Sequence, residues 1–176
     1  MVNQRRMTGR LEGDFVVFLI GMRVNRWWKI WRWLRVALAM PRMVRELAAH
    51  PELGFLGAEQ WFGRTTVMVQ YWRSRDLLMA YARQRGAEHL PAWRAFNKLI
   101  GTNGDVGIWH ETYCVHAGEY ENVYVNMMPF GLGKVGALVE AGGHASGKTK
   151  TRLASGEASV SGAQYRVNRS RANSSG

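Results

Sequence analysis

The sequence has a single cysteine, Cys114, among 176 residues, so it can form neither an intramolecular disulfide nor a cysteine-based zinc cluster. Sparse cysteine fits a reducing compartment, and we expect a cytoplasmic protein. No apolar run approaches the roughly 20 residues of a membrane-spanning helix. The apolar run over residues 15–22 is also short of that length and lacks a signal-peptide cleavage pattern. P-loop and flavin or dinucleotide fingerprints are absent, and the histidines show no zinc-ligand spacing, so we predict neither a nucleotide nor a metal site.

Acidic residues are scarce: 13 Asp and Glu stand against 24 Lys and Arg, for a net charge of +11. Residues 141–176 hold six basic residues and one acidic residue, which leaves +6 on the rest of the chain. Because this segment is rich in Gly, Ser and Arg, we predict a disordered basic tail that serves solubility. It would give nucleic acid only weak, salt-sensitive attachment, and no recognition motif predicts a specific nucleic-acid partner. The expected organisation is a flexible leader over 1–13, an α+β domain over 14–140 and the tail over 141–176.

Apolar periodicity predicts the order strand, helix, strand, strand, helix, strand, which is the ferredoxin-like pattern. Pro41 should break the first helical region, and Gly63-Arg64 should form a hairpin turn. Ser74 is typical of a helix N-cap. The expected strands are 14–24, two runs within 55–74, 106–115 and 121–127, and the expected helices are 26–40, 41–50, a helix from 75 and a helix from 91.

The first strand is apolar on both faces. Alternation places Phe15, Val17 and Leu19 on one face, and the intervening Val16 and Phe18 on the other. Helices of a single ferredoxin-like unit cover only one face of its sheet. We therefore expect a homodimer in which two sheets pack together and enclose an apolar cavity.

Several stretches in order resemble a known family: FLIGMRVNRWWKIWRWL, VQYWRS, HLPAWRAFN, VGIWHETY and YVNMMPFGL. Together they resemble a monooxygenase-like family of the dimeric α+β barrel superfamily, which includes a relative in the biosynthesis of the terpenoid fumagillin. The resemblance extends from residue 14 to 132. The family motif often reads NMPPFGL, and Met128 stands here at the first proline position. The resemblance implies a dimeric barrel that works either without a cofactor or with haem, and a small apolar or aromatic substrate such as a terpenoid or polyketide.

Catalytic candidates lie mainly on the strand VGIWHETY. His110 and Glu111 point to opposite faces, and the superfamily does its chemistry in the inter-sheet cavity, so each face offers a candidate. His110 would act as a general base, and Glu111 with Tyr113 would orient or protonate an oxygenated substrate. His89 precedes a helix start and would lie at the cavity mouth. If haem is bound, His110 or His89 would be its axial ligand. The alternatives are a His110 hydrogen-bonded beneath the helices and a His89 bonded to backbone.

Five further residues are candidates for substrate binding. Asn97 is a polar residue on an apolar helical stripe with Trp93, and such a residue needs a partner. Tyr71 and Trp72 end a strand and point to opposite faces, so one of them should line the cavity. Arg23 closes the first strand and would meet a polar substrate group. Core packing and solvent exposure remain the alternatives for these residues.

The stretch RWWKIWRWLRVALAMPRM holds four of the eight tryptophans. Helical spacing predicts a core face made of Trp27, Ile30, Trp31, Leu34, Ala37 and Leu38. Lys29, Arg32 and Arg35 should be surface cations. Trp28 and Trp33 fall outside the core arc and would meet a second copy, the C-terminal segment or a membrane surface.

These features leave three functions open. The first is a monooxygenase-type enzyme in which a cavity base makes an electron-rich carbanion or phenolate that reacts with dioxygen. The second is a haem dehydratase or haem oxidant on the same fold. The third is a non-catalytic ligand-binding or membrane-surface module.

Overall fold

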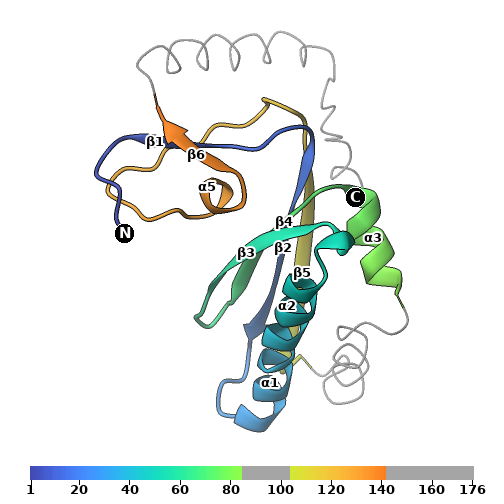
Figure 1. Ribbon diagram of the computed structural model, residues 1–176. Coiled ribbons are helices and arrows are strands. Elements are labelled where there is room, and N and C mark those ends of the chain that lie inside the picture. Colours follow the sequence, from blue (N-terminus) through green and yellow to red (C-terminus); the bar gives the residue numbers. More distant parts are fainter. Residues whose placement is uncertain (85–103, 142–176) are drawn as a thin grey trace, which may run out of the picture. The chain divides into compact units, whose positions relative to one another are not determined.

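The computed structural model of the chain describes residues 1–84 and 104–141, apart from the side chains of Arg35, Val36 and Ala39 (Figure 1). Residues 1–140 form one compact unit. No helix in the described ranges is long and apolar enough to cross a membrane. The strands are β1 Met7–Arg10, β2 Phe15–Val24, β3 Phe55–Trp61, β4 Val67–Trp72, β5 Val106–Val115 and β6 Ala137–Glu140. The helices are α1 Ile30–Ala37, α2 Ala39–Ala49, the short 3-10 helix η1 Pro51–Leu53, α3 Arg75–Arg83 and α5 Leu132–Val135.

The main sheet has four strands in the order β3-β4-β2-β5, with every neighbouring pair antiparallel. Its central strand β2 pairs along its whole length with β5, from Phe15 opposite Val115 to Val24 opposite Val106. The helices α1 and α2 connect β2 to β3, and α3 follows the β3–β4 hairpin. This chain order and strand order confirm the ferredoxin-like α+β fold.

Local sequence signals set several helix boundaries as expected. Pro41 lies in the first turn of α2, where its missing N–H breaks no hydrogen bond, and the turn residue Leu38 separates α2 from α1. Ser74 caps α3, because its Oγ accepts a hydrogen bond from the Leu77 N–H at 3.2 Å. The predicted helix from residue 91 lies outside the described residues.

The helices cover one face of the sheet, which we call the helix face (Figure 1). Val16 and Trp72 on this face pack with Met43 and Leu47 of α2 and with residues of α3. The opposite face, which we call the open face, carries Val17, Leu19, Tyr71, Val69, Glu111 and Tyr113.

The chain's own C-terminal part covers some of the open face. Lys134 of α5 forms a 3.1 Å ion pair with Glu59 of β3. A Cβ atom at Gly57 would lie 2.6 Å from the Val135 side chain, so glycine at this bulge leaves room for α5. A second copy is therefore not needed to cover the β3 side of this face. The homodimer remains a prediction for the part nearer β5.

Two segments differ from expectation. Residues 7–10 of the expected flexible leader form β1, which pairs with β6. A four-residue strand gives little periodic signal, and its partner lies more than a hundred residues away. The predicted strand over 121–127 is wrong: only isolated bridges form there, from Tyr124 to Met7 and from Met127 to Asn3. Asn126 has a positive φ of 54°, which interrupts an extended strand.

The predicted core face of the tryptophan helix is wrong for most of its residues. Trp31 is 80% exposed, and Trp27, Ile30 and Leu38 are exposed as well. Ala37 does pack against Met22, Val24 and Val106 on the helix face, as predicted, but Trp33, which was predicted to lie outside the core face, packs there with it. The helical projection failed because α1 begins only at Ile30 and ends before Leu38, so the stretch is not one continuous helix.

Candidate active site

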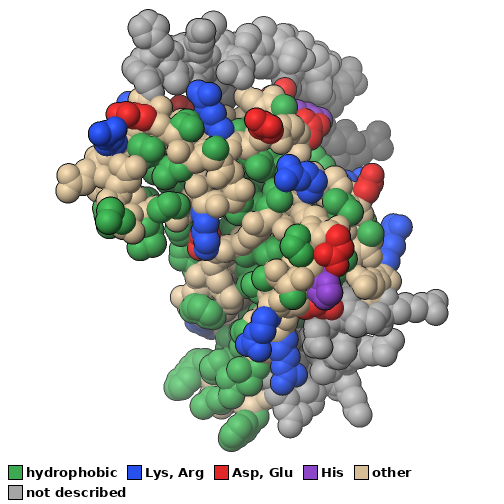
Figure 2. All heavy atoms as spheres, in the orientation of Figure 1, with side chains coloured by type: hydrophobic (Ala, Val, Ile, Leu, Met, Phe, Trp, Pro, Cys, Tyr) green, Lys and Arg blue, Asp and Glu red, His purple; other side chains and the backbone are tan. Residues whose placement is uncertain are grey.

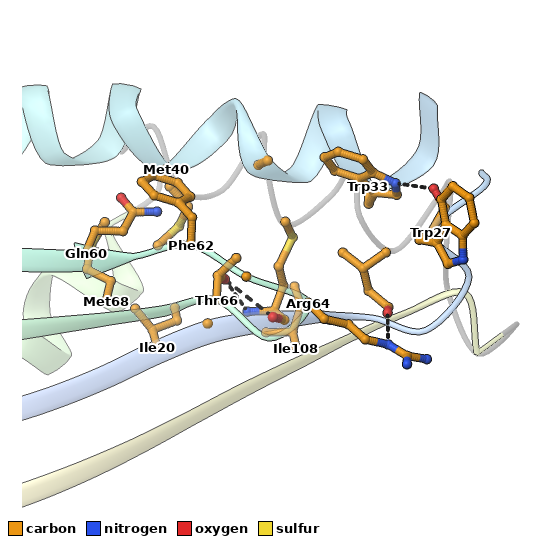
Figure 3. A pocket seen from close by; sticks show the side chains of 15 residues that line it. Ile20, Trp27, Trp33, Met40, Gln60, Phe62, Arg64, Thr66, Met68 and Ile108 are labelled. Atoms are coloured by element: carbon orange, nitrogen blue, oxygen red, sulfur yellow. Dashed lines mark hydrogen bonds between the residues drawn. The ribbon is translucent and has the colours of Figure 1, made fainter. Parts of the chain in front are cut away.

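The described residues enclose an apolar pocket of about 500 Å³ between the helix face and α1 (Figure 3). Pockets of this size are typical of small-molecule sites. The strands supply its floor, and α1 and the start of α2 supply its roof. The apolar lining consists of Ile20, Met22, Val24, Met68, Ile108, Trp27, Trp33, Ala37, Met40 and Phe62.

Few polar side chains reach this pocket. The Thr66 hydroxyl accepts a hydrogen bond from the Met22 N–H at 3.0 Å, so it is committed to the backbone. Arg64 Nε donates to the Val24 carbonyl at 3.4 Å. Gln60 lies beside Met40 and Phe62 in Figure 3, and its amide has no hydrogen-bond partner among the described residues. Gln60 can therefore bind a polar group on an otherwise apolar ligand.

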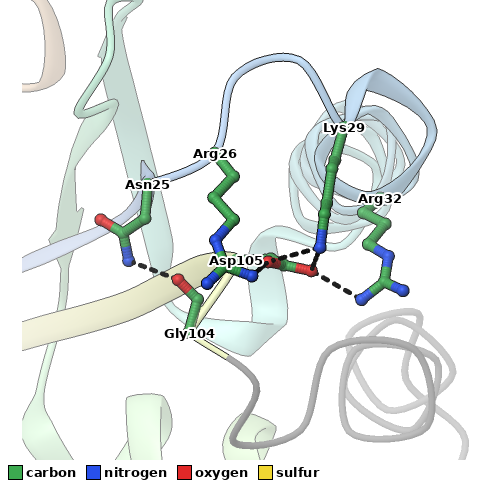
Figure 4. Close-up of polar contacts among 6 residues, drawn as sticks. All are labelled: Asn25, Arg26, Lys29, Arg32, Gly104 and Asp105. Carbon is green, nitrogen blue, oxygen red and sulfur yellow. Dashed lines mark hydrogen bonds and ion pairs between the residues drawn. The ribbon is translucent and has the colours of Figure 1, made fainter.

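Three basic side chains from the segment around the start of α1 gather on one carboxylate, that of Asp105, just before β5 (Figure 4). Asp105, whose side chain is 1% exposed, accepts from Arg26 at 2.9 Å, from Lys29 at 3.0 Å and from Arg32 at 2.6 Å. The hydrogen bond from Lys29, together with the charges of Lys29 and Arg32, lowers the pKa of Asp105. Lys29 and Arg32, which were predicted as surface cations, do stay partly exposed, but they are also tied to the start of β5.

This cluster fixes the rotation of α1 over the pocket. Because Lys29 and Arg32 turn toward Asp105, the part of α1 that carries Trp33 and Ala37 faces the sheet. The Trp33 indole N–H donates to the Trp27 carbonyl at 3.0 Å, which holds both tryptophans at one end of the pocket.

His110 lies on the helix face, beside the pocket. It stands opposite Ile20 in the β2–β5 register, and Ile20 and Ile108 both line the pocket. Its ring centroid is 5.8 Å from that of Phe18, and the residue is solvent-exposed. His110 is thus the sequence-predicted catalytic candidate that the described structure brings nearest to the pocket.

Glu111 and Tyr113 lie together on the open face. The Tyr113 hydroxyl donates to Glu111 at 2.6 Å, and this bond raises the pKa of Tyr113, because the proton that it holds is shared with a carboxylate. Both residues are exposed. Trp109 shares this face, and its buried indole N–H has no partner in the described parts of the chain. The open face therefore carries polar groups, and neither Glu111 nor Tyr113 lines the pocket beneath α1.

The remaining candidate residues lie in different parts of the fold. Tyr71 is on the open face, where burial, followed by the nearby Tyr124 and Glu59, raises its pKa. Trp72 is 1% exposed in the core, and its indole N–H donates to Gln70 at 2.9 Å. Arg23 contacts the Thr65 hydroxyl at 2.8 Å at the end of β2. His89, Trp93 and Asn97 lie outside the described residues.

A histidine-ligated haem does not fit this pocket as far as it is described. The lining residues contain methionine but no histidine, and His110 stands outside the lining. The described ranges also contain no cluster of three or more His, Cys, Asp or Glu side chains that would hold a metal ion.

Sequence reasoning missed most of the pocket lining. Gln60 and Thr66 had no signal beyond a polar residue in a β-rich stretch. Asp105 did carry a signal, because an acidic residue is scarce in this chain and it directly precedes an apolar strand. Its role becomes visible only when the distant cations are placed beside it.

The model of the family described as "Monooxygenase af470-like" matches residues 15–132, which span β2 to the start of α5. The chain belongs to this family. It is 27% identical over 132 residues to "Monooxygenase af470" of Aspergillus fumigatus, a match that covers 70% of this chain and 46% of the relative. The chain thus spans less than half of that curated relative.

The crystal structure of SnoaB, a cofactor-independent oxygenase from Streptomyces nogalater, is similar with a TM-score of 0.42 and 19% identity. That match covers 57% of this chain and 91% of SnoaB. The matched family region contains the pocket lining, the Asp105 cluster and both faces of β5.

Proposed function

We propose that this member of the monooxygenase af470-like family oxygenates a small apolar or aromatic substrate bound beneath α1. The observation that carries the proposal is the apolar pocket of about 500 Å³ within the part of the chain that matches the family. Terpenoid and polyketide intermediates are suitable substrate classes, because they are largely apolar and carry few polar groups. Gln60 would bind one such group.

In the proposed reaction, His110 accepts a proton from an acidic C–H group of an electron-rich substrate. The carbanion gives its electron pair to dioxygen, and a C–O bond forms. The resulting peroxide takes up a proton. Loss of the second proton from the same carbon then breaks the O–O bond, releases water and leaves a carbonyl. One oxygen atom enters the product, the other enters water, and the substrate supplies all the electrons.

The proposal moves the substrate from the inter-sheet cavity to the opposite face of the sheet. Its support is the position of the described pocket, with His110 beside it. A homodimer packed through the open face would leave this pocket accessible in each copy. Glu111 and Tyr113 would then lie near the dimer contact and not at the substrate.

A ligand-binding experiment tests the pocket. Ala37→Leu adds bulk inside the pocket, and Ala48→Leu makes the same change at an exposed position of α2. Titration with a naphthol, followed by tryptophan fluorescence, should show binding to the wild type and to Ala48→Leu. Binding to Ala37→Leu should be at least tenfold weaker. Equal affinities for all three proteins would place the ligand elsewhere.

An oxygen-uptake experiment tests the chemistry. The purified full chain is mixed with a panel of phenols and terpenoids in an oxygen electrode. For any substrate that is turned over, His110→Ala should abolish uptake but leave naphthol binding intact, and Glu111→Gln should retain uptake. The reverse pattern would assign the chemistry to the open face. Absence of uptake across the panel would argue for a non-catalytic binding module.

A further inference from the structure

The stretch from Trp27 to Leu38, which contains α1, and the tip of the β3–β4 hairpin expose large apolar side chains that the core does not use. We call this set the aromatic patch: Trp27, Trp28, Ile30, Trp31, Leu38 and Phe62. Trp28 is 60% exposed and Phe62 is 79% exposed. Figure 2 shows hydrophobic side chains gathered where Figure 1 places α1, with basic side chains beside them. So many exposed large apolar side chains indicate an interaction surface.

Positive charge borders the aromatic patch. Arg26, Lys29 and Arg32 remain between 33% and 48% exposed while they share the single carboxylate of Asp105. Three cations against one anion leave a local surplus of two positive charges. A partner for this surface should therefore be apolar at its centre and negatively charged around it.

We infer that the aromatic patch docks on an anionic lipid surface. Tryptophan is suited to the headgroup region, where its ring enters the apolar boundary and its N–H stays hydrated. Arginine and lysine beside it attract anionic headgroups. A second copy of the chain is a poorer occupant, because a symmetric contact would bring the same basic side chains toward one another.

The aromatic patch is continuous with the pocket. Trp27 lies at one end of the pocket and Phe62 at the other, and both are exposed residues that also line it. A docked protein would therefore present its pocket to the lipid, and an apolar substrate would enter without crossing water. This delivery step rests on the proposed function, whereas docking itself needs no turnover.

Vesicle co-sedimentation of the full chain tests docking. The vesicles are either phosphatidylcholine alone or phosphatidylcholine and phosphatidylglycerol in equal parts. Trp28→Ser/Trp31→Ser removes two outward tryptophans that do not line the pocket. Val123→Ser/Met128→Ser is the matched control, because it removes two exposed apolar side chains from another segment. The basic residues of 141–176 are present in every protein compared.

The wild type and the control should bind the anionic vesicles at least tenfold more strongly than the tryptophan variant does. Both should also bind the anionic vesicles at least tenfold more strongly than vesicles of phosphatidylcholine alone. Quenching of tryptophan fluorescence by brominated lipid should fall in the tryptophan variant. Equal binding by all proteins would assign attachment to the basic residues of 141–176 and overturn the inference. So would absence of wild-type binding, or a lipid-free dimer that the tryptophan variant loses. Vesicle binding without any oxygen uptake would leave docking in place and remove only the proposed activity.

Discussion

Trp31 and Trp33 lie two residues apart in α1, and they give a direct test of how this helix is rotated. Trp31 is 80% exposed, whereas Trp33 packs against Met22, Val24 and Val106. Replacing each tryptophan with alanine changes the same side chain in the same helix, so differences in helix propensity cancel. The helical projection of the sequence predicts that Trp31→Ala is the damaging change. The structure predicts the opposite.

The size of the difference follows from burial. Truncating a fully buried tryptophan costs about 3–5 kcal/mol, so half-buried Trp33 should cost about 2 kcal/mol. Loss of its hydrogen bond to the Trp27 carbonyl adds roughly 0.5 kcal/mol. Trp31→Ala should change the free energy of unfolding by no more than about 0.5 kcal/mol, as is usual at exposed sites.

Thermal and urea unfolding of the full chain measure this difference. For a domain of this size about 1 kcal/mol corresponds to roughly 3 °C in Tm, so Trp33→Ala should lower Tm by roughly 7 °C and Trp31→Ala by less than about 2 °C. The measurement should be made without lipid and at low protein concentration, so that no partner covers Trp31. A loss for Trp31→Ala that equals or exceeds the loss for Trp33→Ala would refute the placement of α1.

Three further outcomes are expected. Asp105→Asn should lower Tm at neutral pH, because it removes the anion that gathers Arg26, Lys29 and Arg32. The folded pKa of Asp105 is lowered, so the stabilities of wild type and variant should converge as the pH falls below about 3.8, through that lowered pKa. His116→Ala should lower stability mainly between about pH 3.8 and 6.5, because the ion pair lowers the pKa of Asp14 and raises the pKa of His116. The stability difference should fade as the pH falls through the lowered Asp14 pKa, and as it rises through the raised His116 pKa. Urea unfolding at a series of pH values measures this difference. Gly21→Ala should severely reduce Tm or soluble yield, because the added Cβ would overlap the backbone carbonyl of Thr66. Gly63→Ala should be nearly neutral, since its Cβ would lie at an ordinary distance of 3.6 Å from the Thr65 carbonyl oxygen.

Sequence patterns predicted the strands of the main sheet well because each strand carries its own signal. In β2, apolar residues fill both faces, and in β5 the alternation placed His110 and Glu111 on opposite sides, as the register requires. Ser74 fixed the start of α3 through a contact only three residues long. Such short-range signals do not depend on contacts with distant parts of the chain.

The features that sequence patterns missed depend on long-range contacts. β1 pairs with β6, which lies more than a hundred residues later in the sequence, and no residue in MTGR indicates that partner. Which face of β5 meets a pocket depends on where the helices lie, so the pattern left His110 and Glu111 as equal candidates. The homodimer, by contrast, depends on a second chain, and it stays a prediction.

One ionic cluster links the stability of this protein to its candidate site. If α1 buried the whole arc predicted from its sequence, Trp31 would point into the space between helix and sheet and fill it. With Lys29 and Arg32 held on Asp105, the small residue Ala37 is the part of that arc in α1 that lines this space, and a pocket remains. The same rotation turns Trp31 outward, into the aromatic patch. Pocket and exposed surface are therefore two consequences of one carboxylate, and Asp105→Asn should weaken naphthol binding and vesicle binding together.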